Sequence, residues 1–169
     1  MSNLEPYYYT LETTGFPSNV KFVNMPADFK IYLLCDTPDK RQVCIYQDRN
    51  DFRDSNSKED KNVQRLFLTL SKKLSESENV IELMDLYDDK ELHPAHYTKI
   101  DSNKKTVYRI RKGGVRVYFV IIGSDIILFR LSIKLQNKIN KSEESIIDSR
   151  VKAIFSCPPH ENQFLKRVL

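Results

Sequence analysis

The most regular alternation of apolar and polar residues lies between residues 107 and 134, which read VYRIRKGGVRVYFVIIGSDIILFRLSIK. Three runs rich in Val, Ile, Phe and Tyr are separated by two short turn signals, Gly113-Gly114 and Gly123-Ser124-Asp125. Runs of β-branched and aromatic residues divided by such turns are typical of neighbouring strands, so we predict an antiparallel meander.

The two turns also predict the register of these strands. A two-residue turn at Gly113-Gly114 places Arg111 opposite Arg116, and a three-residue loop at 123–125 places Tyr118 opposite Arg130. One face is then apolar and consists of Val115, Val117, Phe119, Ile121, Ile127, Phe129, Leu131 and Ile133. The other face is basic and consists of Arg109, Arg111, Arg116, Tyr118, Arg130 and Lys134. A shift of one residue in either turn would move arginines into the core, which favours this register.

Helical periodicity precedes the meander. Apolar residues recur at helical spacing over 61–74, which predicts an amphipathic helix able to cover the apolar face. Ser75 and Ser77 interrupt this pattern, and Asn79 is a good N-cap for a second apolar run that reaches Leu86. We therefore expect a helical hairpin over residues 61–88, packed on the apolar face of the sheet.

The remaining segments give weaker patterns. Residues 29–47 predict a hairpin, because FKIYLLC and RQVCIYQ flank a turn-forming segment at 36–40. The polar residues 48–60 predict a loop, and so does the segment before the sheet that contains His93 and His96. Residues 1–28 have no clean period and are interpreted as an N-terminal arm, followed by one domain over 29–169. The expected class is α+β, with an antiparallel sheet.

Composition favours a protein that works in the cytoplasm. Of the 169 residues, 40% are hydrophobic and 30% are charged, with no apolar run near membrane-spanning length and no secretory leader. Cys35, Cys44 and Cys157 are scattered and have no CxxC spacing, which indicates reduced thiols.

Charge is distributed unevenly along the chain. Residues 1–92 contain 12 Lys and Arg against 17 Asp and Glu, whereas residues 93–141 contain 11 against 2. A basic patch over the predicted sheet is what a nucleic-acid-binding protein needs, and it also fits an acidic protein partner. Arginines on one small face repel each other unless an anion lies there, which favours phosphate binding.

His93 and His96 are the candidate residues for metal binding or proton transfer. No Cys, Asp or Glu accompanies them at ligand spacing, so we expect no metal site. An exposed loop histidine is the ordinary interpretation, and proton transfer beside the basic face is the alternative.

Tyr108-Arg109-Ile110-Arg111, the Gly-rich turn, Val115-Arg116-Val117-Tyr118-Phe119-Val120 and an apolar strand ending in basic residues resemble the RelE/ParE toxin superfamily. The HigB-like, phage-derived branch is the most similar. The resemblance continues through residues 134–138 and 142–153, where the family has a short terminal helix. It covers roughly residues 60–155.

The resemblance implies the toxin of a toxin–antitoxin module, an endoribonuclease that cleaves mRNA, usually in the ribosome, without metal or other cofactor. Its partners would be an antitoxin protein, mRNA and the ribosome. The 2′-hydroxyl attacks the adjacent phosphate, which requires a base, an acid and cations. For catalysis, the resemblance implies Arg109, Arg111 and Arg116, with Lys134 near the basic residues that follow the last strand, and Tyr118 is a further candidate for the acid or base. The basic patch adds Lys104, Lys105, Lys112, Arg130 and Lys138 as candidates for RNA binding.

A second interpretation remains open. Ribosome-dependent members often carry a tyrosine near the terminal helix, where this chain has Ser142-Glu143-Glu144-Ser145. The alternative is therefore a non-catalytic binding protein on the same fold. It would be either of the gyrase-inhibiting type or a relative whose basic face docks RNA or an acidic protein.

Overall fold

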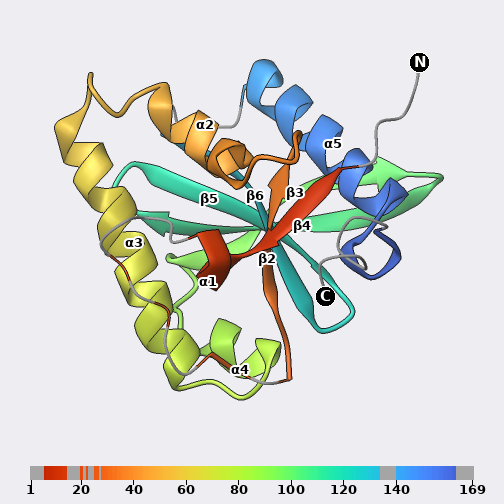
Figure 1. Cartoon of the computed structure of the whole chain (residues 1–169), viewed down its shortest axis with the longest axis horizontal. Helices are drawn as coiled ribbons and strands as arrows, with labels where there is room; N and C mark the ends of the chain where they lie inside the picture. Colours follow the sequence, from red (N-terminus) through yellow and green to blue (C-terminus); the bar gives the residue numbers. More distant parts are fainter. Residues whose placement is uncertain are drawn as a thin grey trace.

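The structure is a computed structural model that describes residues 6–14, 20, 22, 25–26, 28–133 and 140–162. Six strands of the described residues form one sheet in the order β1-β2-β6-β5-β4-β3, flanked by helices (Figure 1). The α+β class is confirmed. The expectation of a wholly antiparallel sheet is wrong, because β2 pairs with β6 in parallel.

The elements have the following bounds in chain order. They are β1 (Tyr7–Thr10), α1 (Leu11–Thr14), β2 (Ile31–Cys35), η1 (Lys40–Gln42), α2 (Cys44–Asn50), α3 (Ser57–Ser75), α4 (Val80–Asp85), β3 (Leu92–Ile100), β4 (Asn103–Lys112), β5 (Val115–Ile122), β6 (Asp125–Ile133), α5 (Lys141–Ser156) and η2 (Pro159–Glu161). Among the described residues, no helix is both long and apolar enough to cross a membrane.

The meander of β4, β5 and β6 is confirmed, and so is its register near the basic face. Arg111 lies opposite Arg116 across the Gly113-Gly114 turn. Tyr118 lies opposite Arg109 on one side and Arg130 on the other, so these five polar positions share one face of the sheet.

A register shift changes the faces of β6 beyond that point. Phe119 pairs with Leu128, so Phe129 is the extra residue of a bulge. Ile127 and Phe129 consequently pack on the face of Tyr118, and placing them with Val117 was wrong. The run Ile126–Phe129 is apolar throughout, so it contains no alternation of apolar and polar residues from which the register shift could be predicted.

The predicted hairpin over residues 29–47 is wrong in its second half. Strand β2 is followed directly by η1 and α2, and an isolated bridge between Cys35 and Val43 is the pairing that remains. In helix α2, the buried residues Cys44 and Ile45 are followed one turn later by two more buried residues, Asp48 and Arg49. This spacing places all four on one side of the helix, which faces the interior.

The predicted loop at 48–60 is shorter than expected, and the loop predicted at 93–96 is wrong. Helix α2 continues to Asn50, and α3 begins at Ser57, where the Asn56 side chain accepts a hydrogen bond from the Glu59 backbone. His93 and His96 belong to the edge strand β3, which contains a bulge between Pro94 and His96. An edge position with a bulge is where a strand tolerates proline.

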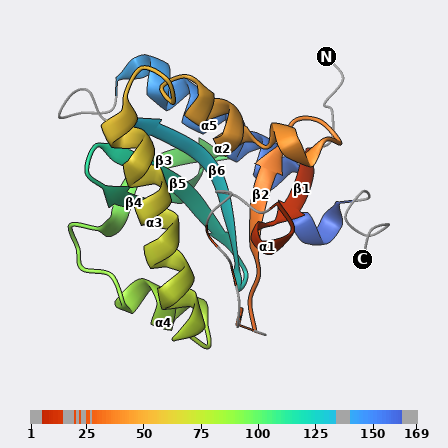
Figure 2. The same cartoon turned by 60° about the vertical axis from the view of Figure 1, so that its left-hand side comes forward.

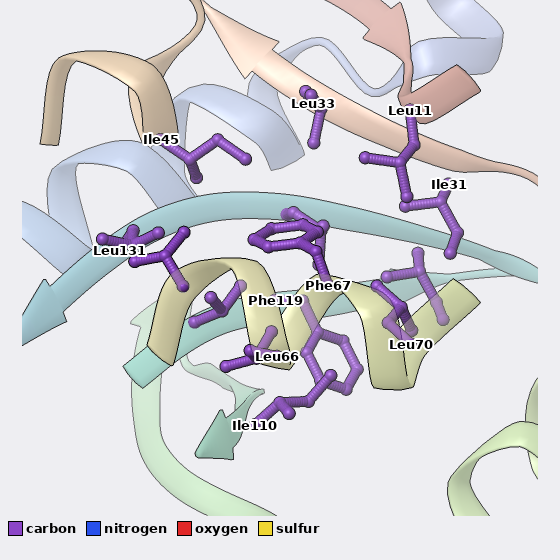
Figure 3. Close-up of a cluster of buried hydrophobic side chains, with 14 of the residues drawn as sticks. Leu11, Ile31, Leu33, Ile45, Leu66, Phe67, Leu70, Ile110, Phe119 and Leu131 are labelled. Atoms are coloured by element: carbon purple, nitrogen blue, oxygen red, sulfur yellow. The ribbon is translucent and has the colours of Figure 1, made fainter. Parts of the chain in front are cut away.

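Both faces of the sheet are covered, by different helices. One core contains Leu66, Phe67 and Leu70 of α3, which point at Phe119 and Ile110 of the sheet (Figure 3). Leu83 of α4 joins this core, as the predicted helical hairpin requires. The other core contains Ile147, Val151 and Ile154 of α5. Figure 2 shows α3 in yellow along one side of the sheet and α5 in blue behind it.

The predicted N-terminal arm contributes β1 to the sheet. Strand β1 pairs antiparallel with β2. The Tyr8 hydroxyl donates to the Cys157 carbonyl at 2.7 Å, and Asn162 Nδ2 donates to the Pro6 carbonyl at 2.5 Å. These bonds connect the two ends of the described chain. The boundary between an arm and a domain at residue 28 stays a prediction.

Candidate nucleic-acid interface

The predicted basic face consists of two parts whose arginines have different partners. In the first part, Arg130 is held by two acidic residues from different helices. Arg130 Nη1 lies 2.7 Å from Asp48 Oδ1, and Arg130 Nη2 lies 2.6 Å from Glu143 Oε2. Burial disfavours the charge, but the hydrogen bonds and charges of Glu143 and Asp48 prevail and raise the pKa of Arg130. Its guanidinium is therefore neutralised within the protein.

Asp48 is the centre of this ion-pair network and is only 4% exposed. Its carboxylate also lies 2.7 Å from Arg150 Nη1 and accepts a hydrogen bond from the Leu131 backbone at 3.0 Å. A buried carboxylate with several charge-assisted donors is compensated for its loss of water. The network thereby joins α2, β6 and α5.

In the second part of the basic face, Arg109, Arg111 and Arg116 lie together without such compensation; we call these three residues the arginine cluster. Arg116 is directly opposite Arg111, and Arg109 is on the neighbouring position of β4 on the same face. No carboxylate of the described residues lies within ion-pair distance of any of the three. The cluster is thus a concentration of positive charge without an ion-pair partner among the described residues, although the charge of Glu59 on α3 offsets a small part of it at Arg116.

Arg116 is buried, at 4% exposure, although it lies on the predicted basic face. Its side chain folds back over the turn, where Nη1 donates to the carbonyls of Gly113 at 2.8 Å and Val115 at 3.1 Å. Arg116 Nε and Arg109 Nε are buried and have no hydrogen-bond partner among the described residues. Two donor atoms of the cluster are therefore unsatisfied.

The electrostatics of the cluster favour an anion. Burial, followed by the charges of Arg109 and Arg111, lowers the pKa of Arg116 to about 10. Burial is also the main reason why the pKa of Arg109 is lowered. A lowered arginine pKa means that the charged form is disfavoured in the folded protein, and a bound phosphate would remove that penalty.

His93 is brought to this cluster by the pairing of β3 with β4. Its Nδ1 lies 2.7 Å from the Pro94 carbonyl and its Nε2 lies 2.5 Å from Arg109 Nη2. A carbonyl accepts and a guanidinium donates, so these two contacts fit the tautomer with its proton on Nδ1. Nε2 is then the acceptor that Arg109 occupies.

Tyr118 lies beside the cluster but is buried, at 4% exposure. Burial and then the Glu143 charge raise the pKa of its hydroxyl, which also shares a hydrogen bond with Ser132. A buried phenol with a raised pKa holds its proton at neutral pH, so Tyr118 can donate a hydrogen bond but is a poor base.

Glu59 of α3 is a site residue that the sequence analysis missed. A Cβ added at Gly114 would lie 2.1 Å from Glu59 Oε2, so the carboxylate packs against the glycine turn. Its Oε1 accepts from Asn62 Nδ2 at 2.9 Å, and Oε2 is buried with no hydrogen-bond partner among the described residues. Two adjacent glycines were the one available signal for such a close approach.

The other predicted residues are spread over the sheet. Lys112 is exposed on the α3 face, opposite Val115, and Lys104 and Lys105 lie at the far end of β4. His96 Nε2 lies 2.8 Å from Asp148 on α5, away from the cluster. Lys134 and Lys138 are outside the described residues. The structure thus brings together Arg109, Arg111, Arg116, Tyr118 and His93.

Comparisons with known protein families, with curated proteins and with solved structures gave no match. The resemblance to the RelE/ParE superfamily therefore rests on the residues that carry it. Any function for this surface has to be argued from its chemistry.

Proposed function

We propose that the protein binds single-stranded mRNA through its phosphates at the arginine cluster, and that it is a RelE-like endoribonuclease toxin controlled by an antitoxin protein in the cytoplasm. The observation that carries this proposal is the contrast within one face. Arg130 is neutralised by Asp48 and Glu143, whereas Arg109, Arg111 and Arg116 form no ion pair among the described residues. Arginines without an ion-pair partner are suited to phosphate oxygens.

The order of elements supports the same proposal. The resemblance implies a first strand followed directly by helices and then by antiparallel strands. Strand β2 followed by α2, α3 and α4 has this order, because the second strand of the predicted hairpin is absent and a helix forms there instead. Strand β1 would then be an addition at the edge.

The proposed reaction is transesterification within the RNA. The 2′-oxygen forms a bond to the adjacent phosphorus, its proton passes to a base, and the bond to the 5′-oxygen breaks as that oxygen receives a proton. Arg109 and Arg111 would grip the phosphate, and Arg116 would stabilise the additional charge of the transition state. When Arg109 turns to the phosphate, it releases His93 Nε2, which then becomes available as the base.

Arg111 offers the cleanest test because its side chain is exposed and has no ion pair among the described residues. Arg111→Gln should keep the fold and reduce the affinity for a single-stranded RNA at low salt. It should also lower the rate at which mRNA is cleaved with ribosomes present. Arg53→Gln, an exposed arginine between α2 and α3, is the matched control. Equal RNA binding by both variants and the wild type would contradict the proposal.

A non-catalytic binding protein is the second candidate, and one observation favours it. Both nitrogens of His93 are occupied and Tyr118 is buried, so no described residue of the cluster offers a base without rearrangement. RNA binding that depends on Arg111, with mRNA left intact both with and without ribosomes, would establish this candidate instead.

A further inference from the structure

Strand β3 presents an exposed aromatic ring at the open edge of the sheet. Tyr97 is 57% exposed, although tyrosine is an amphipathic residue that normally covers its ring. Lys99 follows two residues later, so both side chains stand on the same face of the strand. This is the face opposite α5, at the end of the sheet farthest from the Gly113-Gly114 turn.

The neighbouring strand adds further positive charge to that face. Tyr97 lies opposite Thr106, and Lys99 lies opposite Lys104. Like charges directly opposite each other destabilise a strand pair. No carboxylate of the described residues is in ion-pair distance of either lysine. The pair therefore opposes folding, and an anionic ligand would reverse its effect.

The opposite face of the same hairpin is anchored. Thr98 donates to Asp148 at 2.7 Å, and Lys105 Nζ lies 4.9 Å from the centre of the Phe155 ring. Both contacts are with α5. One face of the β3–β4 hairpin is thus anchored to α5, and this anchoring also positions Tyr97, Lys99 and Lys104 on the opposite face.

From this arrangement we propose that Tyr97, Lys99 and Lys104 form a second contact for single-stranded RNA. The Tyr97 ring stacks on one unpaired base, and the two lysines, which lie beside it toward the tip of the hairpin, bind phosphates on one side of that base. An exposed ring next to cations is the chemistry that recognises a single strand, because an unpaired base offers its face while a duplex conceals it. The inference rests on the proposed function and extends it to a segment remote from the arginine cluster.

The spacing of the two contacts suits one RNA strand. Arg109 and Lys104 are five residues apart on β4, which corresponds to about 17 Å along a strand. The edge of β3 separates the two faces, so the RNA would pass over this edge. Lysines on an edge strand can also serve only to prevent aggregation. That role gives no reason for an exposed Tyr97.

The test uses the full chain and two labelled probes of equal length, with affinity measured by fluorescence anisotropy. One probe is a 2′-O-methyl oligoribonucleotide, which cannot be cleaved by 2′-oxygen attack. The other has the same phosphates but lacks the bases. Tyr97→Ala should weaken binding of the first probe roughly five- to a hundredfold and leave binding of the second unchanged. Tyr97→Phe should bind both as the wild type does.

The lysines are tested through salt dependence. Changing Lys99 and Lys104 together to Gln should lower the slope of log affinity against log salt by about 1.4, since each phosphate contact on a single strand contributes about 0.7. Lys72→Gln, an exposed lysine of α3, is the matched control and should leave the slope unchanged.

The outcomes separate this inference from the proposed function. Wild-type affinity in Tyr97→Ala, with binding still lost in Arg111→Gln, overturns the stacking contact and leaves the arginine cluster as the RNA site. No RNA binding by the wild type overturns both. Increased aggregation of the lysine variant with an unchanged salt slope would show that the lysines only protect the edge.

Discussion

Arg130 and Asp48 are 82 residues apart in the sequence, yet Arg130 Nη1 and Asp48 Oδ1 lie 2.7 Å apart. This contact fixes the junction of β6 with α2, and Arg150 of α5 binds the same carboxylate. It also decides what part of the basic face is available. A positive side chain that the sequence assigned to RNA binding is used to hold the fold together.

Removing Asp48 should therefore destabilise the protein strongly. Asp48→Ala leaves Arg130 and Arg150 with an uncompensated buried charge and removes the acceptor of the Leu131 N–H. Breaking a buried pair from one side costs about 3–5 kcal/mol in the free energy of unfolding, measured by urea titration. Asp39→Asn, which breaks the exposed pair with Arg41, should leave the midpoint unchanged. A loss below about 1 kcal/mol in Asp48→Ala would contradict the role of the network.

The glycine turn and Glu59 should be energetically coupled. Gly114→Ala places a Cβ against the buried Glu59 carboxylate and should cost about 1–3 kcal/mol in the free energy of unfolding. Glu59→Ala removes the obstructing carboxylate, so adding Gly114→Ala to that background should cost much less. A double-mutant cycle measures the difference. Simple additivity of the two changes would show that Glu59 moves aside without cost.

The pair of His96 and Asp148 should give the protein a measurable sensitivity to acid. Burial favours the protonated carboxyl, but hydrogen bonds from Thr98 and His96, with the charges of His96 and Lys152, prevail and lower the pKa of Asp148. A carboxylate whose folded-state pKa is lowered stabilises the fold above about pH 4, and this contribution is lost as the pH falls through the folded value.

Asp148→Asn tests whether the Asp148 carboxylate stabilises the fold at neutral pH and loses this effect in acid. Because the Asp148 side chain is 37% exposed, the effect at neutral pH should be at most about 1 kcal/mol. The difference in unfolding free energy between the wild type and the variant should shrink as the pH falls below 4. A difference that stays constant from pH 7 to pH 3 would show that the carboxylate charge contributes nothing.

The sequence was sufficient where one face of an element is apolar and the other polar. Alternation located β5, and the Gly113-Gly114 turn predicted its register against β4 correctly, because a slip would have buried arginines. The helical period of α3 was recognised for the same reason, although its start at Ser57 lies among polar residues.

Sequence patterns failed to predict the structure where tertiary contacts determine it. The run RQVCIYQ is rich in strand-forming residues, but its Cys44 and Ile45 are buried as part of a helix that also buries Asp48. Asp48 lies in a polar stretch and has no local partner, so its pairing with Arg130 was not predictable. No sequence feature near Arg116 predicted that its side chain would be buried against the Gly113-Gly114 turn.

The last prediction compares two arginines of the same face, Arg116 and Arg130, each replaced by Met. The two side chains lie on neighbouring strands, β5 and β6, and both are largely buried. Arg130→Met leaves Glu143 and Asp48 without their partner, so it should cost about 3–5 kcal/mol in unfolding free energy. Arg116→Met removes a charge that the folded protein disfavours, because burial, Arg109 and Arg111 lower its pKa to about 10.

The sign of the Arg116 effect follows from that shift. A lowered pKa of a basic group means that its charge opposes folding at neutral pH, and that this cost is relieved only above about pH 10. Loss of the hydrogen bonds to the Gly113 and Val115 carbonyls offsets part of the gain. Arg116→Met should therefore be neutral or stabilising in urea unfolding at pH 7, while its affinity for single-stranded RNA falls.

Arg116→Lys keeps the charge and should retain part of the binding without the gain in stability. If Arg116→Met instead unfolds as easily as Arg130→Met, both arginines serve the fold, and the phosphate site has to be sought elsewhere on the surface.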